Sequence, residues 1–256
     1  MNIYVLLKRT FDTEEKIEIE NGEIIDDGAE FIINPYDEYA VEEAIQIRDE
    51  HGGEVSVVTV GDEEAEKQLR TALAMGADQA YLIEDEDIEN GDEYSTQELL
   101  KAFFAEKEYD LILGGNVAVD GGSGQIGPRL ADQLDIVHVT SAVDITLEGN
   151  EAKVERDVEG DQEIISVSLP ALITAQQGLN EPRYPSLPGI MKAKKKPLET
   201  LDLDDLDVDE EDAEGKTKTV ERFLPPEKQA GRILEGEVEG QVQELVRLLK
   251  TDAKVL

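Results

Sequence analysis

A glycine-rich stretch between Tyr109 and Ala131 carries the pattern in this chain that is best suited to chemistry. It begins with Leu111–Leu113, a short apolar run of the kind that a parallel sheet buries on both faces. Four glycines follow between residues 121 and 127, and residues 125–133 have helix-forming character. A strand that passes into a helix through glycines exposes backbone N–H groups at the positive end of the helix dipole. The stretch therefore predicts a seat for a phosphate or another anion.

The segment from Gly122 to Gly127 also matches the dinucleotide pattern G-x-G-x-x-G. That fingerprint normally joins a first strand directly to its helix, whereas here it follows a later strand after several intervening residues. Asp144 is a candidate for the ribose-binding acid, but it falls in a region predicted to form edge strands. We therefore do not expect an ordinary NAD site, and the chain has no G-x-x-x-x-G-K-[ST] phosphate loop.

Other chemistry is poorly represented in the sequence. With no cysteine, the chain can form no disulfide, thiolate nucleophile or cysteine-ligated cluster. His51 and His138 are far apart, neither belongs to an H-E-x-x-H pattern, and His138 fits a structural role better than a catalytic one. We predict no metal site and no catalytic residue, so any reaction would come from a bound cofactor.

The composition is strongly acidic, with 61 Asp and Glu against 24 Lys and Arg and a net charge of −37. Nucleic acid is an unfavourable partner for such a surface. Disorder is one explanation of this charge, but the acids lie within periodic segments. A folded protein from a salt-adapted (halophilic) cytoplasm, where ions screen the repulsion, explains both features. The N-terminus resembles a first strand rather than a signal peptide, and no run of about 18 apolar residues predicts a membrane span.

The elements that would position the glycine-rich turn alternate between strands and helices. Apolar runs predict strands at 3–7, 55–60, 80–83 and 111–113, and periodic segments predict helices at 35–51, 65–75, 96–106 and 125–133. Asn21-Gly22 predicts a hairpin. This alternation favours a doubly wound, mostly parallel α/β sheet with a Rossmann-like arrangement.

Ligands of such sheets lie beyond the carboxyl ends of the strands. Leu6, Val60 and residues 116–124 all fall near these ends. Asn34-Pro35 begins a helix at the same edge, with Asn34 as its cap. The pair is either a helix start alone or also part of a ligand site.

From Ser141 onward the pattern changes to short strands joined by tight turns, through Ala171–Thr174. These predict antiparallel strands added at one edge of the sheet. A proline-rich surface loop and a lysine cluster at residues 192–196 follow, and residues 199–213 contain nine acids, typical of a solvated linker. Residues 238–249 predict an amphipathic helix that packs on the body of the chain or on a partner.

Several separate motifs in this order resemble the beta-subunit family of electron-transfer flavoproteins. They are VLLKRTFDT at 5–13, NPYDEYAVEEA at 34–44, RTALAMGAD at 70–78, AVDGGSGQIGPRLA at 118–131, VERD at 154–157 and LNEPRYPSLPGIMKAKKK at 179–196. The resemblance implies an adenine-nucleotide-hydrolase-like fold and a heterodimer with an alpha subunit that holds the working FAD. It also implies a nucleotide in this chain, bound by Leu6, Asn34, Pro35, Tyr36, Asp37, Val60, Asp120, Gly121, Gly122, Ser123, Gly124, Gln125, Ile126, Gly127, Pro128, Leu130 and Ala131.

The nucleotide is AMP in one branch of the family and a second FAD, able to bifurcate electrons from NADH, in the other. The segment Asp120–Pro128 is closer to the FAD branch, whereas Asn116-Val117 replaces the basic–Gln pair common in that branch. We lean towards FAD and keep AMP as the alternative.

The resemblance further places a partner-recognition loop at 178–191, with Leu187 as its apolar anchor for dehydrogenases such as acyl-CoA dehydrogenase. Its other contact residues would be Asn180, Glu181, Arg183 and Tyr184. A different interpretation buries Leu187 under its own loop. We expect residues 1–198 to form the nucleotide-binding domain and 199–256 to form an acidic linker with a C-terminal arm on the alpha subunit.

The resemblance implies a redox carrier subunit that transfers electrons from dehydrogenases towards a membrane quinone oxidoreductase. Such a subunit turns over no substrate of its own, unless the chain belongs to the bifurcating branch. The alternative is a stand-alone adenine-nucleotide sensor of the universal-stress type. That alternative shares the sheet but leaves the segment 179–196 and the amphipathic tail unexplained.

Overall fold

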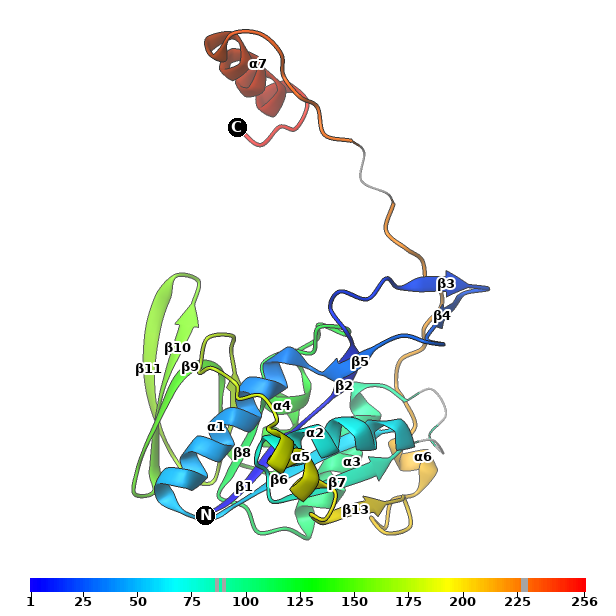
Figure 1. The fold of residues 1–256 in the computed structure, drawn as a ribbon, viewed down its shortest axis with the longest axis vertical. Coiled ribbons are helices and arrows are strands. Elements are labelled where there is room, and N and C mark those ends of the chain that lie inside the picture. The colour runs from blue at the N-terminus through cyan, green and yellow to red at the C-terminus, as the bar shows by residue number, and fades with distance from the viewer. Residues whose placement is uncertain (86–87, 89–90, 227–229) are drawn as a thin grey trace.

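The computed structural model describes residues 1–85, 88, 91–226 and 230–256. Within those residues the body is built on a nine-stranded sheet in the order β11-β10-β9-β12-β8-β1-β6-β7-β13 (Figure 1). The strands of this sheet are β1 (Asn2–Leu6), β6 (Glu54–Gly61), β7 (Gln79–Glu84), β8 (Leu111–Gly115), β9 (Val137–Glu148), β10 (Glu151–Val158), β11 (Asp161–Ser168), β12 (Ala171–Ala175) and β13 (Leu198–Leu201).

The middle of the sheet is parallel, as the apolar runs predict. β1 pairs with β6 and with β8, and its Val5 lies opposite Val57 on one side and Leu113 on the other. Val5, Val57 and Leu113 are buried because both faces of these strands are covered. Their carboxyl ends therefore converge on one edge of the sheet.

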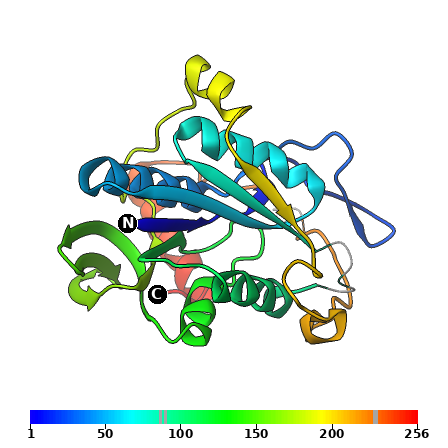
Figure 2. The same ribbon diagram turned by 90° about the horizontal axis from the view of Figure 1, so that it is seen from below.

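Helices cover both faces of the sheet (Figure 2). One face packs against α1 (Pro35–His51) and α2 (Glu66–Met75), through side chains such as Ile45 and Leu69. The other face packs against α3 (Glu93–Ala105) and α4 (Ile126–Gln133), where Phe104 meets the Tyr4 ring edge-on at 5.3 Å. The doubly wound α/β fold predicted from the sequence is confirmed.

Two small antiparallel pairs lie outside the main sheet. β2 (Arg9–Phe11) pairs with β5 (Phe31–Ile33), and β3 (Glu18–Glu20) pairs with β4 (Glu23–Ile25). The turn between β3 and β4 has φ of 53° at Asn21 and 85° at Gly22, which confirms the predicted hairpin. The remaining helices are the 3₁₀ helix η1 (Glu63–Ala65), α5 (Leu187–Ala193), α6 (Glu210–Ala213) and α7 (Val238–Thr251).

The strands after α4 correct part of the sequence analysis. β10 and β11 form the predicted antiparallel edge, but β12 is not an added edge strand. It lies inside the sheet, parallel to β8 and to the first half of β9, which already begins at Val137. β12 is buried at every position and is apolar except for Thr174, which is typical of an interior strand, and only its place after a hairpin in the sequence suggested an edge.

The acidic stretch 199–213 is not a solvated linker. Leu198–Leu201 forms β13, parallel to β7 at the edge of the main sheet. Leu203 and Ala213 are then buried in the core cluster that contains α3. The expected domain boundary at residue 198 therefore falls at the start of a strand. The segment stays on the body because burial of a few apolar side chains among the acids stabilises its packing there.

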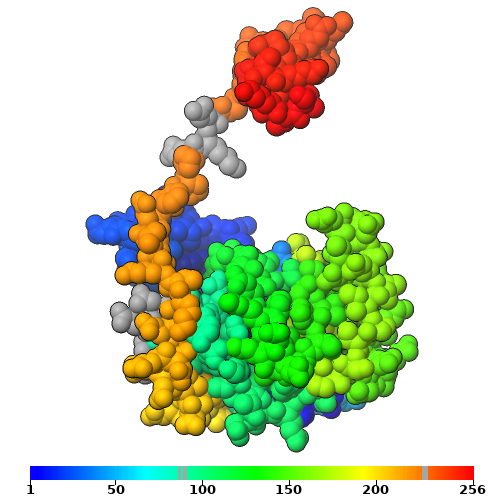
Figure 3. All heavy atoms as spheres, turned by 180° about the vertical axis from the view of Figure 1, so that it is seen from behind, coloured from blue at the N-terminus to red at the C-terminus, as the bar shows by residue number. Residues whose placement is uncertain are grey.

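Beyond residue 213 the chain leaves the body as an arm. It passes the β3–β4 hairpin, where Arg222 forms an ion pair with Glu23 at 2.8 Å, so the orange segment lies beside the blue hairpin (Figure 3). The arm ends in α7, which stands apart from the sheet (Figure 1) and exposes Val242 and Leu245. The predicted amphipathic helix is confirmed, and its packing on a partner stays a prediction. In the described part of the chain no helix is long and apolar enough to cross a membrane.

Candidate functional site

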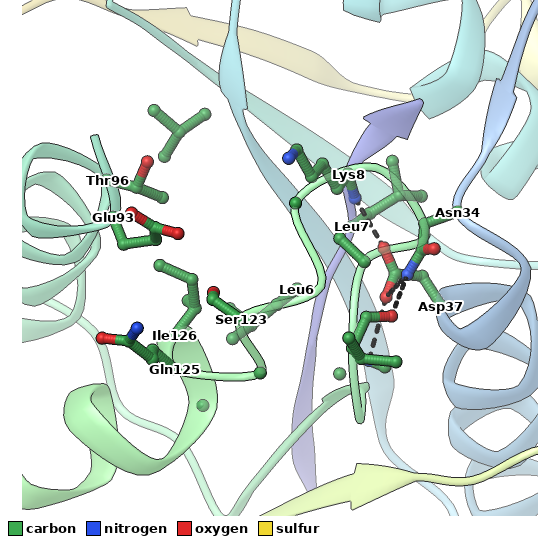
Figure 4. A pocket seen from close by; sticks show the side chains of 18 of the residues that line it. Leu6, Leu7, Lys8, Asn34, Asp37, Glu93, Thr96, Ser123, Gln125 and Ile126 are labelled. Atoms are coloured by element: carbon green, nitrogen blue, oxygen red, sulfur yellow. Dashed lines mark hydrogen bonds between the residues drawn. The ribbon is translucent and has the colours of Figure 1, made fainter. Parts of the chain in front are cut away.

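A cavity of about 310 Å³ opens at the carboxyl ends of the central strands (Figure 4). Its walls come from the ends of β1, β6 and β8, the start of α1, the glycine-rich turn and the N-terminus of α3. The wall on the α3 side carries Glu93 and Thr96, and the opposite wall carries Lys8 and Asp37 (Figure 4). The geometry is that of a ligand site in an open α/β sheet.

Most of the residues predicted for a nucleotide site line this one cavity. They are Leu6, Asn34, Asp37, Val60, Gly121, Gly122, Ser123, Gly124, Gln125, Ile126 and Gly127. Segments separated by more than one hundred positions thus meet in one place, because the parallel register brings their strand ends to a common edge. Whether a nucleotide binds there stays a prediction.

The other predicted residues lie outside the cavity wall. Leu130 and Ala131 are fully buried between α4 and the sheet. Pro35 and Tyr36 form the first turn of α1, and Pro128 lies in the first turn of α4. Asp120 is exposed beside the cavity and forms an ion pair with Lys8. These positions support the wall rather than face its interior.

Asp37 is the centre of a buried hydrogen-bond network at the cavity. Its Oδ2 accepts from the backbone N–H of Lys8 at 2.7 Å. Its Oδ1 accepts from the backbone N–H of Gly115 at 2.9 Å and from the Asn34 amide at 2.9 Å (Figure 4). One carboxylate therefore holds the segment after β1 and the end of β8 against the start of α1.

Asn34 continues this network to the glycine-rich turn and corrects the capping prediction. Its Nδ2 donates to the Val117 carbonyl at 3.0 Å, and its Oδ1 accepts from the Val119 N–H at 3.2 Å. The side chain makes no cap hydrogen bond to α1, and the backbone carbonyl of Asn34 takes the Asp37 N–H instead. Asn34 stands at the N-cap position, but its amide is used to fix the loop across the cavity.

Burial raises the pKa of Asp37 to about 7, although hydrogen bonds from Asn34 and the backbone N–H groups of Lys8 and Gly115 and the charge of Lys8 oppose this shift. A carboxyl that titrates near neutrality beside a cavity is a feature of functional sites and also of structural networks. The three donors that surround Asp37 indicate the structural role.

The glycine-rich turn leads into α4 as the sequence predicts. Gly122 and Gly124 adopt positive φ values of 68° and 60°, which glycine allows at little cost. A Cβ at Gly124 would also lie 3.1 Å from the Asn116 carbonyl. The N-cap residue Gln125 makes no side-chain cap bond, so the N-terminus of α4 opens on the cavity without a side-chain acceptor of its own.

Thr174 of β12 is a residue of the wall that no sequence pattern indicated. Asn116, Thr174 and Ser141 form a cluster in which the Asn116 Oδ1 lies 3.0 Å from the Thr174 hydroxyl and 3.1 Å from the Ser141 hydroxyl. Ser141 has a positive φ of 62°, at the irregularity where β9 changes from a parallel to an antiparallel neighbour. No sequence pattern indicated this cluster, because it depends on β12 lying inside the sheet.

Asp92, at the N-terminus of α3, is a second missed residue and lines the cavity. Its Oδ1 caps α3 through the N–H groups of Tyr94 and Ser95. Its Oδ2 accepts from the N–H groups of Lys216 and Thr217 at 2.9 and 2.8 Å and from the Thr217 hydroxyl at 2.8 Å. The root of the C-terminal arm is thus tied to the wall of the cavity. The capping pattern Asp92-x-x-Ser95 was the available signal.

The proline-rich segment 178–191 is an ordered loop that ends in α5, since Leu187 begins a short helix. Arg183 forms a bidentate ion pair with the buried Glu42 of α1, at 2.7 Å from Nε and 3.0 Å from Nη2. Asn180 donates to the Tyr39 carbonyl and to Glu43. These two predicted contact residues bind their own chain and hold the loop in place.

The apolar residues of the same loop face solvent. Tyr184 is 94% exposed and Leu187 is 79% exposed, and Ile190 and Met191 continue the apolar surface along α5. Leu187 is therefore not buried under its own loop, and Glu181 is likewise exposed. Among the described residues, no group of three or more His, Cys, Asp or Glu side chains is arranged to hold a metal ion.

Comparison with known proteins gives a consistent result. Residues 22–206 match the electron transfer flavoprotein domain. The chain is 65% identical to "Electron transfer flavoprotein subunit beta" of Bacillus subtilis, with 100% of both chains covered. It is 38% identical to "Caffeyl-CoA reductase-Etf complex subunit CarD" of Acetobacterium woodii, with 94% of this chain and 95% of that protein covered. The human "Electron transfer flavoprotein subunit beta" is 36% identical, with 90% and 91% covered.

Proposed function

The chain belongs to the electron transfer flavoprotein family as a beta subunit, and we propose that it works in a heterodimer that carries electrons from dehydrogenases towards a membrane quinone oxidoreductase. Its partner would be the alpha subunit of the same carrier. The observation that carries this proposal is the 65% identity to a beta subunit. The match covers the full length of both chains, so it extends over the cavity segments and the arm. The exposed apolar side of α7 supplies a surface on which the alpha subunit packs.

We propose that the cavity holds an adenosine phosphate, either free AMP or the AMP half of FAD. The residues fit such a group. The cavity volume of about 310 Å³ lies at the lower end of the range of about 300 to 1,000 Å³ for ligand pockets. The glycine-rich turn lets the backbone approach a phosphate closely, and the α4 N-terminus favours negative charge.

The two occupants have different consequences. Bound FAD supplies the capacity to accept and release electrons, which an aromatic adenine nucleotide alone lacks. With AMP the subunit would have a structural nucleotide, and the alpha subunit's FAD would carry all electrons. With a second FAD the subunit would be capable of bifurcating electrons from NADH. The protein's own residues act alike in both cases, by holding the phosphate and excluding water from the strand ends.

We further propose that the loop 178–191 docks the electron donor, a dehydrogenase such as an acyl-CoA dehydrogenase. Tyr184 and Leu187 are exposed on a loop that Arg183 and Asn180 hold against α1. An apolar side chain on a fixed loop loses little conformational entropy when it docks, which makes it an efficient anchor.

The net charge of −37 supports a salt-rich cytoplasm as the working environment. In low salt the unscreened repulsion between the acids should lower the free energy of unfolding. A halophilic source and a cytoplasmic location are both parts of this proposal.

The proposal is tested by the nucleotide and flavin content of the complex formed with the alpha subunit. The two chains are produced together, purified in high salt and heated, and the released FAD and AMP are counted per heterodimer by chromatography. Two FAD per heterodimer would assign FAD to the cavity, and one FAD with one AMP would assign AMP. Electron acceptance from a dehydrogenase is then followed by flavin absorbance.

A colourless complex that accepts no electrons would contradict the carrier function. A stable monomer or homodimer that binds ATP and no alpha subunit would favour a stand-alone nucleotide sensor instead.

A further inference from the structure

The cavity has an unusual charge balance for a site that receives an anion. Asp85, Asp92 and Glu93 contribute carboxyl groups to its wall. Among the described residues that line it, Lys8 is the only lysine or arginine. A phosphate that enters would meet this acidic wall, and the glycine-rich turn offers partial charges only. One full positive charge is therefore available for compensation, and it belongs to Lys8.

Lys8 occupies a suitable position. It follows β1, so its side chain leaves the strand end that opens on the cavity, opposite the wall with Glu93 and Thr96 (Figure 4). Its Nζ lies 2.9 Å from Asp120 Oδ1 and 2.8 Å from Oδ2, across the mouth between β1 and the glycine-rich turn. The ammonium group is thus held beside the turn in which the sequence predicts a phosphate seat.

The ion pair with Asp120 leaves Lys8 available to a ligand. The Lys8 side chain is 50% exposed and that of Asp120 is 34% exposed, and ion pairs in such surroundings contribute little to stability. An ammonium group has three donors, so it can bind a phosphate oxygen and keep one contact with Asp120.

The backbone of Lys8 is fixed separately from its side chain. Its N–H donates to the buried Asp37 carboxylate at 2.7 Å. This hydrogen bond does not depend on the identity of the side chain at position 8. Substitution of Lys8 can therefore remove the charge while the Asp37 network stays in place.

We propose that the Lys8 ammonium group binds the nucleotide phosphate and gives the cavity its preference for a phosphorylated nucleotide over the corresponding nucleoside. This inference rests on the proposed nucleotide site and adds to it the residue that discriminates the charged group. The phosphate belongs to AMP or to the AMP half of FAD, and the chemistry is the same for both.

The test compares wild type with Lys8→Gln and Lys8→Arg in the full-length chain, freed of nucleotide and titrated calorimetrically with AMP, FAD and adenosine. Lys8→Gln should weaken binding of AMP about tenfold or more, because it removes a charge-assisted hydrogen bond. Binding of adenosine should not change, since adenosine has no phosphate. Lys8→Arg should retain most of the AMP affinity. FAD provides a second comparison. If FAD binds wild type more tightly than AMP does, and Lys8→Gln weakens the binding of FAD, the phosphate that Lys8 binds is that of the dinucleotide.

Lys101→Gln is the matched control, because Lys101 is also half-exposed and ion-paired, to Glu98 at 3.0 Å, and lies outside the cavity. It should leave all three affinities unchanged. If Lys8→Gln does not fold, Lys8→Met takes its place, because it keeps an apolar stem of similar length and removes the charge. It should weaken binding of AMP by the same factor and leave binding of adenosine unchanged.

Three outcomes overturn the inference, and they can be distinguished. Equal loss of AMP and adenosine affinity in Lys8→Gln, or no loss of either, would show that Lys8 does not bind the phosphate. The proposed nucleotide site would remain in both cases. Failure of wild type to bind AMP, FAD or adenosine would remove the nucleotide site and the inference together.

Discussion

The amide nitrogen of Asn34 lies 2.9 Å from Asp37 Oδ1, and this buried pair joins three segments that are distant in sequence. Asp37 holds the backbone after β1 and at the end of β8, and Asn34 holds the segment that leads into the glycine-rich turn, through Val117 and Val119. Both residues belong to the motif NPYDEYAVEEA, which the family resemblance assigns to the nucleotide. Their polar atoms are used by the protein itself, so the motif shapes the cavity that the ligand would enter.

The pH dependence of stability should carry a contribution from Asp37. Burial raises its pKa from 3.8 to about 7, so the folded chain keeps a proton that the unfolded chain releases between about pH 4 and pH 7. The unfolded state then binds fewer protons, and the contribution of Asp37 to the free energy of unfolding decreases as pH rises through this window. Urea unfolding in constant high salt at pH 5 and pH 8 measures it, in wild type and in Asp37→Asn.

The difference in free energy of unfolding between wild type and Asp37→Asn should be larger at pH 5 than at pH 8. Asp132→Asn, at an exposed position of α4, is the control and should give the same small difference at both values. A difference for Asp37→Asn that does not vary with pH would show that this carboxyl is not titrating in the window.

Gly115 should not tolerate a side chain. A Cβ there would lie 2.2 Å from Asp37 Oδ1 and 2.7 Å from the Cβ of Tyr36. Gly115→Ala should therefore lower the free energy of unfolding by about 1–3 kcal/mol, or more if the hydrogen bond to Asp37 is lost. Gly121→Ala is the matched control, because nothing lies within 4 Å of its added Cβ, and it should change stability by less than about 0.5 kcal/mol. Thermal and urea unfolding compare the two variants, and equal effects would contradict the close approach of Gly115 to Asp37 and Tyr36.

Asp92→Asn should release the root of the arm without removing the cap of α3. The Asn side chain retains one oxygen for the N–H groups of Tyr94 and Ser95, but its amide cannot accept from Lys216 and Thr217. Backbone amides 216 and 217 should then exchange with solvent hydrogen at least several times faster, as measured by mass spectrometry. Thr217→Val removes only the hydroxyl contact and should have a smaller effect. Unchanged protection in Asp92→Asn would show that the arm is held by other contacts.

Leu187→Ala should weaken the complex with a dehydrogenase and slow electron acceptance, with the bound nucleotide and flavin unchanged. An exposed apolar anchor at the centre of an interface typically contributes about 1–2 kcal/mol or more, which corresponds to about a five- to thirtyfold loss of affinity. Because Leu187 is 79% exposed, the free energy of unfolding should change by less than about 0.5 kcal/mol. Flavin reduction kinetics at varied dehydrogenase concentration measure the effect.

Val137→Ala is the control for this prediction, since Val137 is 47% exposed at the amino end of β9. It should leave the kinetics unchanged. Loss of bound nucleotide in Leu187→Ala, or unchanged kinetics, would contradict the assignment of the loop to partner docking.

Local pattern was sufficient for the elements whose signal lies within a few residues. The hairpin at Asn21-Gly22, the buried strand Leu111–Gly115 and the helix after the glycine-rich turn are found where the sequence places them. Turn residues that need positive φ and apolar runs of strand length act through local sterics and burial, so they can be recognised without the fold.

Local pattern was not sufficient where a segment's role depends on its neighbours in space. β12 lies inside the sheet, and β13 and Ala213 keep an acidic segment on the body. Asn34 was correctly placed at the start of a helix, but its amide bonds across the cavity to Val117 and Val119.

The sequence by itself determined the class of fold, the glycine-rich turn and the family. The first two follow from patterns within short segments, and the family follows from motifs in a given order along the chain. Only the tertiary structure decided which of those residues face the cavity and which support it. It also decided that Lys8, Asp92 and Thr174 share its wall. The physical reason is the parallel sheet, which collects the ends of distant strands at one edge, where hydrogen-bond partners are set by register and not by sequence distance.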